Sequence, residues 1–210
     1  MSAISFVTLG PAGTNHDLVA SKYLAFHDIA AARLRLVGSI GGGLEEVRAG
    51  TADYLIVCAV HPEAPRAVGR YFREVFVVDT FISPSRPLAV LARRDVAAPR
   101  SIGVLHPSTS DYVDLARWQR VERITDGSLH DVARGVLEGH YDAGLVYLDY
   151  AATHPEHLRV VEELGSPDDA WLVLGRRRTF REPVLAWKHA PVAALFHQHG
   201  QRTASNAVGP

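Results

Sequence analysis

The sequence predicts an α/β protein made of two lobes with a cleft between them. The main observation is that strand-like segments alternate with helix-like segments, which implies parallel strands with helices packed on a sheet. The alternation occurs twice, in residues 4–60 and again in 101–148. The length of 210 residues, with 47% hydrophobic and 21% charged side chains, suits one large domain or two small lobes.

The first lobe begins with a strand that ends in a glycine turn. Residues 10–13 separate the strand ISFVTL from a segment that Thr14 or Asn15 can cap as a helix. An irregular stretch with two prolines follows later, at 61–73. The expected elements are, in order, a strand at 4–9, a helix from this cap to Phe26, strands at 33–37 and 53–60 around a helix at 44–49, and a strand at 74–82.

The second lobe repeats the order of strands and helices, and the chain then returns to the first lobe. The expected elements are strands at 87–93, 101–105, 121–125, 143–148, 158–164 and 171–175, and helices at 111–118, 129–138 and 149–153. We therefore assign 1–82 to lobe 1, 83–168 to lobe 2, 169–187 to a return to lobe 1, and 188–210 to a C-terminal tail. The tail ends in a polar stretch without amphipathic period, which predicts partial disorder.

Composition excludes several classes of partner. The formal net charge is -1 and no block of five like charges appears, so neither nucleic acid nor an anionic membrane is expected as a partner. Cys58 is the only cysteine, which excludes an internal disulfide framework and suits a reducing compartment. The N-terminus has no signal-peptide pattern, and no apolar run approaches the ~18 residues of a membrane span. We expect a cytoplasmic protein that binds a small molecule.

In each lobe a strand ends in a short polar turn that opens a helix. Such a turn presents free backbone N–H groups and the positive end of a helix dipole, which together can hold an anion. An alternative is that Thr14, Ser108 and Ser110 only cap helices. The candidate binding residues are Gly13, Thr14 and Asn15 in the first lobe and Ser108, Thr109 and Ser110 in the second, with His106 beside them.

Two facing anion sites would suit a ligand with two carboxylates. Arg86 lies between the lobes in the segment SPSRPLAV and could complete this clamp, because a guanidinium pairs with a carboxylate through two hydrogen bonds. The alternative for an isolated arginine is a solvated surface position.

Neither a metal nor a nucleotide cofactor is expected. Eleven histidines are present, but none has the HExxH spacing of a metal site, and the closest pairs lie in a loop or in the tail. The glycines at 41–43 match neither GxGxxG nor GxxxxGK[ST].

Five segments, in order, resemble the catalytic domain of prephenate dehydratases. The most specific is LGPAGTNHDLVASKYL, which matches the family's G-P-x-G-T turn before a helix. The others are EEVRAGTADYLIV, VLHPSTSDYVDLARW, GSLHDVARGVLEGHYDAGLV and DDAWLVLG, and the resemblance covers about residues 4–176. It implies a two-lobed fold like that of type 2 periplasmic-binding proteins. Since dimers are common among such proteins, it also implies a homodimer.

The departures from the dehydratase pattern concern its chemistry. Dehydratases carry a Thr-Arg-Phe tripeptide before the last strand, whose threonine is thought to help expel the ring hydroxyl of prephenate. Asp169, Ala170 and Trp171 occupy the corresponding positions. Residues 57–62 (VCAVHP) replace the family's V-P-x-E-N-S segment. The chain also stops without a regulatory ACT domain, so feedback by phenylalanine is not expected.

The chain resembles more closely the branch typified by the prephenate decarboxylase of bacilysin biosynthesis. The stretch VVDTFISPSRPLAVLARRD is similar to a segment of that branch, which also lacks Thr-Arg-Phe. The resemblance implies loss of the ring carboxylate without loss of the hydroxyl, which gives a non-aromatic product of antibiotic metabolism. This outcome requires an acid beside the ring diene rather than beside the hydroxyl.

The candidate acids are His106, His16 and Asp169, each at a junction that should face the cleft. The alternative for each histidine is a helix cap or a solvated position. Trp171 would pack on the substrate ring if it faces the cleft and would otherwise be a core residue. Three alternative functions stay open: action on a related ring acid in tropone or tropolone biosynthesis, prephenate dehydration, and binding of a small acid without catalysis.

Overall fold

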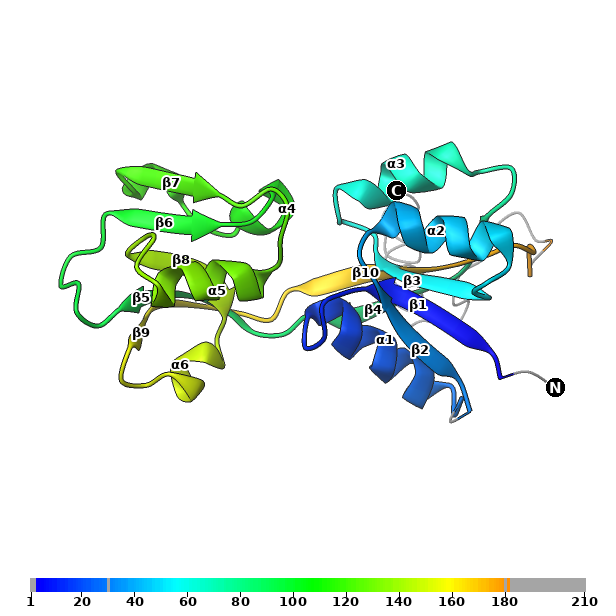
Figure 1. Cartoon of the computed structure of the whole chain (residues 1–210), viewed down its shortest axis with the longest axis horizontal. Helices are drawn as coiled ribbons and strands as arrows, with labels where there is room; N and C mark the ends of the chain where they lie inside the picture. The colour runs from blue at the N-terminus through cyan, green and yellow to red at the C-terminus, as the bar shows by residue number, and fades with distance from the viewer. Residues whose placement is uncertain (1–2, 30, 180, 182–210) are drawn as a thin grey trace, which may run out of the picture. The chain divides into compact units, whose positions relative to one another are not determined.

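The computed structural model describes residues 3–29, 31–179 and 181. The chain divides into two units, residues 1–178 and 179–210, and the first contains the helices and strands of Figure 1. The predicted tail at 188–210 and the end of the predicted return segment, 182–187, lie outside the described residues. Among the described residues, no helix is both long and apolar enough to cross a membrane.

The first unit contains two five-stranded sheets, and we call each sheet with its helices a lobe. In lobe 1 the strand order is β2-β1-β3-β10-β4. β1 is parallel to β2 and β3, whereas β10 is antiparallel to both of its neighbours. The strands are β1 (Ser5–Leu9), β2 (Arg33–Val37), β3 (Tyr54–Cys58), β4 (Phe76–Pro84) and β10 (Asp168–Gly175).

Lobe 2 repeats this arrangement with the order β7-β6-β8-β5-β9. β6 is parallel to β7 and β8, and β5 is antiparallel to β8 and β9. The strands are β5 (Leu88–Arg93), β6 (Ser101–Val104), β7 (Arg120–Arg123), β8 (Ala143–Tyr147) and β9 (Leu158–Gly165). The predicted α/β class with two lobes is therefore confirmed.

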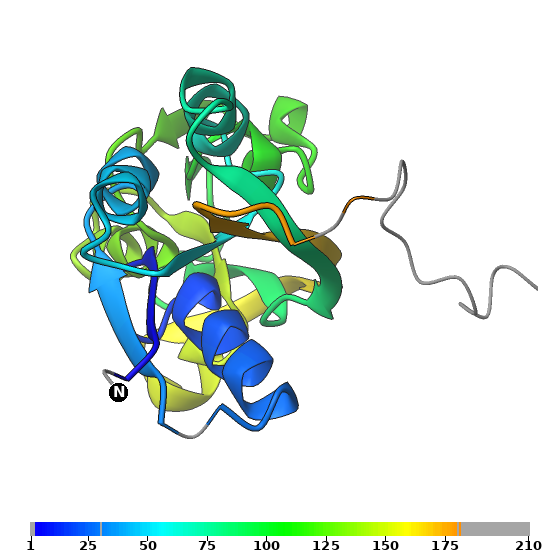
Figure 2. The same cartoon turned by 90° about the vertical axis from the view of Figure 1, so that its right-hand side faces the viewer.

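Helices cover both faces of the lobe 1 sheet (Figure 2), and alternation along the strands explains why. In β3, Leu55 and Val57 belong to the apolar cluster under α2 and α3, whereas Ile56 and Cys58 belong to the cluster under α1. A strand that is buried on both faces is apolar at every position, as YLIVC is. The helices are α1 (Asn15–Phe26), α2 (Ile40–Ala49) and α3 (Glu63–Arg70).

In lobe 2 the core forms between α5 and the strands β5, β6 and β8. A capping box fixes the start of α5. The side chain of Ser128 accepts the backbone N–H of Asp131, and the side chain of Asp131 accepts the backbone N–H of Ser128. The helical elements are α4 (Pro107–Ser110), a 3-10 turn η1 (Leu115–Arg117), α5 (Leu129–Leu137) and α6 (Tyr150–Thr153).

The chain crosses between the lobes twice. The first crossing is at residues 85–87, between β4 and β5, and the second is at 166–167, between β9 and β10. The boundaries expected from the sequence, after 82 and after 168, fall close to these crossings. The difference arises because β4 continues to Pro84 and β10 already begins at Asp168.

Two helix expectations are wrong. Residues 61–73 are not irregular, since α3 begins after Pro62 and places Pro65 in its first turn, where the missing N–H has no helical partner to lose. The helix expected at 111–118 does not form: the short α4, with Pro107 at its first position, ends at Ser110, and within 111–118 only the turn η1 is helical. The side chain of Asp114 starts that turn by accepting a hydrogen bond from the Ala116 N–H.

Candidate functional site

A cavity of about 120 Å³ lies between the lobes and is lined by residues of both. It has about ten times the space that a single buried water needs, so it suits a small molecule rather than a folded partner. Much of its lining follows the carboxyl ends of the parallel strands β1, β3, β6 and β8, where ligands bind in open α/β sheets. The polar side chains that line it are Thr14, Asn15, His16, His61, Ser85, Arg86, His106, Ser108, Thr109, Tyr112, Ser128, Tyr147 and Asp169.

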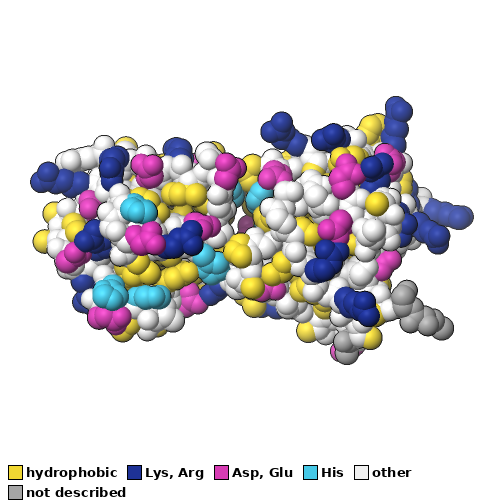
Figure 3. All heavy atoms as spheres, viewed as in Figure 1, with side chains coloured by type: hydrophobic (Ala, Val, Ile, Leu, Met, Phe, Trp, Pro, Cys, Tyr) yellow, Lys and Arg dark blue, Asp and Glu magenta, His cyan; other side chains and the backbone are white. Residues whose placement is uncertain are grey.

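Three histidines form a row along one side of this cavity. The ring centroids of His16 and His61 lie 5.7 Å apart, and those of His61 and His106 lie 5.1 Å apart. His16 and His61 follow β1 and β3 of lobe 1, whereas His106 follows β6 of lobe 2. The row therefore crosses from one lobe to the other, and histidine side chains are visible where the lobes meet (Figure 3).

The row is uncharged at neutral pH. Burial, with a smaller contribution from the neighbouring histidines, lowers the pKa of His16 to about 3 and that of His106 to about 4. Burial also lowers the pKa of His61, against the opposing effect of Glu63. Three neutral imidazoles offer hydrogen bonds to a ligand without a fixed charge.

Hydrogen bonds define the neutral form of two of these rings. His16 Nε2 accepts the N–H of Cys58 at 3.3 Å, so its proton is on Nδ1. His61 Nδ1 accepts the N–H of Glu63 at 3.3 Å, so its proton is on Nε2. His106 Nδ1 lies 2.7 Å from the hydroxyl oxygen of Ser108. The Nε2 atoms of His61 and His106 have no hydrogen-bond partner among the described residues.

A second polar chain enters the cavity from the crossing segments. Asp169 on β10 is mostly buried, and its carboxylate accepts the hydroxyl of Ser85. The side-chain amide of Asn15 donates to the same hydroxyl oxygen at 2.6 Å, and its oxygen accepts the N–H of Arg86 at 3.1 Å. Asn15 therefore connects the start of α1 to the first crossing, and Ser85 connects the two crossings through Asp169.

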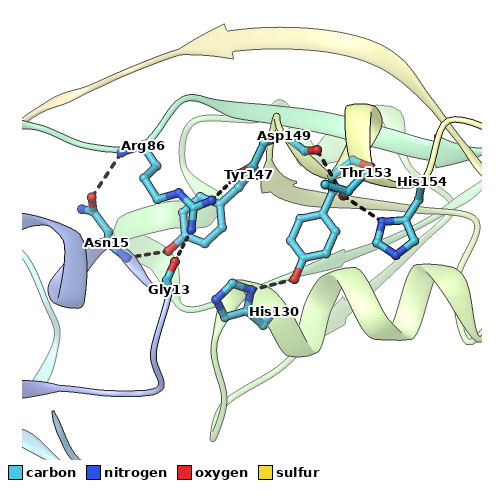
Figure 4. A network of polar contacts seen from close by, with 9 residues as sticks. Gly13, Asn15, Arg86, His130, Tyr147, Asp149, Thr153 and His154 are labelled. Atoms are coloured by element: carbon cyan, nitrogen blue, oxygen red, sulfur yellow. Dashed lines mark hydrogen bonds and ion pairs between the residues drawn. The ribbon is translucent and has the colours of Figure 1, made fainter.

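Arg86 is already engaged by the protein, as Figure 4 shows. Its guanidinium donates to the carbonyl of Gly13, forms an ion pair with Asp149, and lies over the ring of Tyr147 with its carbon 4.2 Å from the ring centroid. The expected clamp therefore exists only in part. Arg86 lines the cavity, but an internal carboxylate already balances its charge.

The backbone amides expected to hold an anion in lobe 1 have acceptors within the chain. Gly13 donates to the carboxylate of Asp17 at 2.8 Å, and Asn15 donates to the hydroxyl of Tyr147 at 2.9 Å. Thr14 donates through its N–H and its hydroxyl to the Pro11 carbonyl. Gly13 does not line the cavity. As the structure stands, these amides are not free donors.

The same correction applies in lobe 2. The amides of Thr109 and Ser110 both donate to the His106 carbonyl at 3.0 Å, which closes the single turn of α4. Ser110 is fully buried and its hydroxyl accepts from Arg123, so it does not face the cavity. Ser108 and Thr109 do line the cavity and remain candidate contacts.

Trp171 does not line the cavity. It is fully buried in the cluster under α1, where its ring packs edge-on against His16 at 5.0 Å and stacks with Phe81 at 6.3 Å. The Trp171 ring is covered by the apolar residues of this cluster and by His16, whereas Asp169, two residues earlier, lines the cavity. Trp171 therefore supports the ring of His16 rather than a ligand.

Two further reactive groups line the cavity in their neutral forms. Burial raises the pKa of the Cys58 thiol to about 11. Burial also raises the pKa of the Tyr112 hydroxyl, and the nearby Asp169 and Cys58 raise it in the same direction. A protonated thiol is a poor nucleophile. The cavity therefore lacks an activated nucleophile among its described residues and has the character of an acid-base and binding site.

Sequence reasoning missed five of the polar residues that line this cavity, namely His61, Ser85, Tyr112, Ser128 and Tyr147. Two of them carried a usable signal, because His61 and Tyr147 lie at or just beyond the carboxyl end of a parallel strand. Ser85 carried none, since its role depends on Asn15 and Asp169, which are distant in the sequence.

No protein-family model matches the sequence, and no curated protein matches it. Solved structures do share the fold. A prephenate dehydratase from Arthrobacter aurescens, in complex with L-Phe, is 22% identical with a TM-score of 0.59, and the match covers 86% of this chain and 62% of that one. The chain thus spans less than two thirds of that dehydratase.

Two other solved structures share the same fold. A prephenate dehydratase from Staphylococcus aureus is 12% identical with a TM-score of 0.52, over 94% of this chain and 80% of that one. An ABC transporter structure from Parabacteroides distasonis is 11% identical with a TM-score of 0.56, over 99% and 74%. The fold is that of type 2 periplasmic-binding proteins, which the dehydratase catalytic domain shares.

Proposed function

We propose that the protein is a lyase that removes the ring carboxylate of prephenate, or of a closely related cyclic acid, without forming an aromatic product. The observation that carries this proposal is the identity of the groups around the cavity. β10 presents the carboxylate of Asp169 where a dehydratase has threonine, and three neutral histidines lie along the cavity wall.

Two outcomes are possible after the ring carboxylate is lost. When the bond between the ring and its carboxylate breaks, CO₂ leaves and the electron pair moves into the ring diene. The pair can then expel the ring hydroxyl, which needs a proton donor beside that oxygen, or it can take a proton at a ring carbon. A carboxylate already bonded by Ser85 is a weak donor to a leaving hydroxyl, so Asp169 favours the second path.

The polarity of the cavity supports decarboxylation. The charge of a carboxylate is concentrated on two oxygens, but in the transition state it spreads over the ring. Buried neutral groups such as the Cys58 thiol and the His16 ring stabilise the concentrated charge less than water does, which lowers the energy difference between the bound carboxylate and the transition state.

Product analysis with prephenate tests the proposal. Purified protein is incubated with prephenate near neutral pH, and the products are separated and identified by mass and by NMR. We expect a dihydro-hydroxyphenylpyruvate, heavier than phenylpyruvate by one water. Phenylpyruvate formed faster than in a protein-free control would contradict decarboxylation and favour the dehydratase alternative. If prephenate is left unchanged, tropone-related ring acids are the next substrates to test.

A binding protein without catalysis is the second candidate. The match to the ABC transporter structure covers nearly the whole chain, and the Arg86 ion pair is a resting contact that a ligand carboxylate could replace. This candidate predicts that ring acids raise the melting temperature while none is consumed. Turnover of any of these acids would reject it.

A further inference from the structure

The fixed charges of the cavity do not balance those of a cyclic dicarboxylate, the class of ligand that the proposed function implies. The inference below rests on that proposed function. Arg86 is the one cation among the described residues that line the cavity, and Asp169 is the one anion. Since Asp149 pairs with Arg86, the described lining holds no unpaired fixed positive charge. Two carboxylates would enter a site that already carries a negative charge.

His61 and His106 are placed to answer this need. They come from different lobes, and their rings meet edge to face with centroids 5.1 Å apart and an interplanar angle of 71°. Each ring uses Nδ1 within its own lobe, His61 with the Glu63 amide and His106 with the Ser108 hydroxyl. In both rings this leaves Nε2 available to a ligand.

We propose that His61 and His106 together form a protonatable anion subsite, which takes up one proton when a cyclic dicarboxylate binds and holds one of its carboxylates between the two lobes. The proton goes to Nδ1 of His106, where it can donate to the hydroxyl oxygen of Ser108, because Nδ1 of His61 already accepts the Glu63 N–H. It supplies the positive charge that the fixed residues do not provide, and the Nε2–H group of each ring donates to the bound carboxylate. The same imidazolium is then an acid next to the ring.

The surroundings limit the uptake to one proton. His16 on lobe 1 is also neutral and lies beside His61, and the carboxylate of Glu63, at the start of α3, acts on His61. Cys58 and Tyr112 are protonated neighbours in the cavity wall, and Asp169 and Arg86 are its charged members. Two positive charges on adjacent rings would repel each other, so the second ring stays neutral.

The direction of the pH dependence follows from linkage. In the free protein burial keeps the pKa of both rings below the ordinary value, so they are neutral at pH 7. A bound carboxylate raises the pKa of one ring, because it favours the charged form. The complex then holds one more proton than the free protein, and affinity falls as the pH rises, by up to about tenfold per pH unit.

Calorimetry with an unreactive ligand tests this subsite. The probe is tetrahydroprephenate, which keeps both carboxylates and the hydroxyl but lacks the ring double bonds that accept the electron pair. Its binding heat is measured at about pH 6.5 in two buffers of different ionisation enthalpy, which gives the number of protons taken up. We expect about one proton per ligand, and a dissociation constant that rises toward tenfold per unit between about pH 5.5 and 7.5.

Variants of His61 and His106 test whether these two residues are responsible for the proton uptake. His61→Asn and His106→Asn keep a side chain that can hydrogen-bond but cannot become a cation. Each should weaken binding about tenfold or more, and His106→Asn should also abolish proton uptake and flatten the pH dependence. The matched control is His140→Asn, because His140 is an exposed histidine of lobe 2 away from the cavity. The control should leave proton uptake unchanged, and circular dichroism should show that all variants are folded.

The outcomes separate this inference from the proposed function. Binding without proton uptake, or uptake that persists in both variants, overturns the subsite and leaves the lyase standing. Failure of the probe to bind while prephenate is consumed also overturns the subsite, since the probe keeps both carboxylates. If the probe does not bind and prephenate is not consumed, both proposals fall.

Discussion

The guanidinium of Arg86 and the carboxylate of Asp149 form an ion pair at the edge of the cavity. A ligand carboxylate that binds Arg86 therefore has to compete with Asp149. The pair is half open to solvent, since the Asp149 side chain is 56% exposed and that of Arg86 is 20% exposed. Such a pair contributes little to stability and can be exchanged at low cost.

Removing the internal carboxylate should improve ligand binding. Asp149→Asn leaves the guanidinium paired only with neutral groups, and we expect KM for prephenate to fall about threefold to tenfold with folding unchanged. Asp126→Asn, an exposed change in the same lobe, is the control. An unchanged or higher KM would contradict competition between Asp149 and the ligand.

The carboxylate of Asp169 should matter for turnover more than for stability. Asp169→Asn keeps the size of the side chain and can still accept a hydrogen bond from Ser85, but it removes the charge beside the ring. We expect kcat to fall about a hundredfold with a small change in KM. Asp168→Asn changes the preceding, exposed carboxylate of the same strand and should leave kcat unchanged. Equal effects of both changes would argue against a role in the reaction.

Trp171 should behave as a core residue. Trp171→Ala removes a fully buried ring and should lower the free energy of unfolding by about 3–5 kcal/mol, measured by denaturant titration. Trp171→Phe retains a ring under His16 and should cost less, with KM for prephenate unchanged within about twofold. A large rise in KM for the folded Trp171→Phe protein would instead indicate contact with the ligand.

Two glycines should respond to alanine in opposite directions. Gly13 has φ of 78°, so Gly13→Ala forces a side chain into the left-handed region and should destabilise the protein by about 1 kcal/mol or more. Gly41 lies within α2, and a Cβ there would meet nothing within 4 Å. Gly41→Ala should therefore stabilise the protein by up to about 1 kcal/mol. Thermal unfolding of both variants checks the contrast.

His16 should make the fold sensitive to acid. Its pKa in the folded protein is about 3, below the value of 6.5 for an unfolded histidine, so the unfolded chain binds more protons between these values. Stability is therefore full above about pH 6.5 and falls as the pH is lowered toward 3, by up to about 1.4 kcal/mol per pH unit. His16→Gln should reduce this slope in denaturant titrations at a series of pH values. An unchanged slope would show that other groups dominate.

The order of strands and helices was predictable from the sequence because each element carries a local signal. Short apolar runs that contain β-branched residues mark β1, β3 and β8, and turn residues separate them from the helices. The misplaced helices have a local cause as well, since proline breaks a helix in its interior but is tolerated in its first turn, as at Pro65 and Pro107.

The site was predictable only in part, because contacts across the cavity have no local signal. The turn at Gly13 and Asn15 indicates free amides, yet Asp17 and the hydroxyl of Tyr147 occupy them, and Tyr147 is 132 residues away from Asn15. The same holds for Asp149 and Arg86. Sequence patterns identify which groups can bind a ligand, whereas the tertiary fold determines which of them already have a partner.

Because the chain crosses between the lobes twice, the two sheets can be completed at different times during synthesis. The lobe 2 sheet is assembled from one continuous segment, residues 88–165, so it can fold as soon as that segment has left the ribosome. The lobe 1 sheet must wait, since β10 lies between β3 and β4 and is made last. Until Gly175 emerges, β3 and β4 each present an unpaired edge to other chains in the cell. β3 and β4, which are made before lobe 2, therefore gain β10 as a neighbour only after lobe 2 is complete.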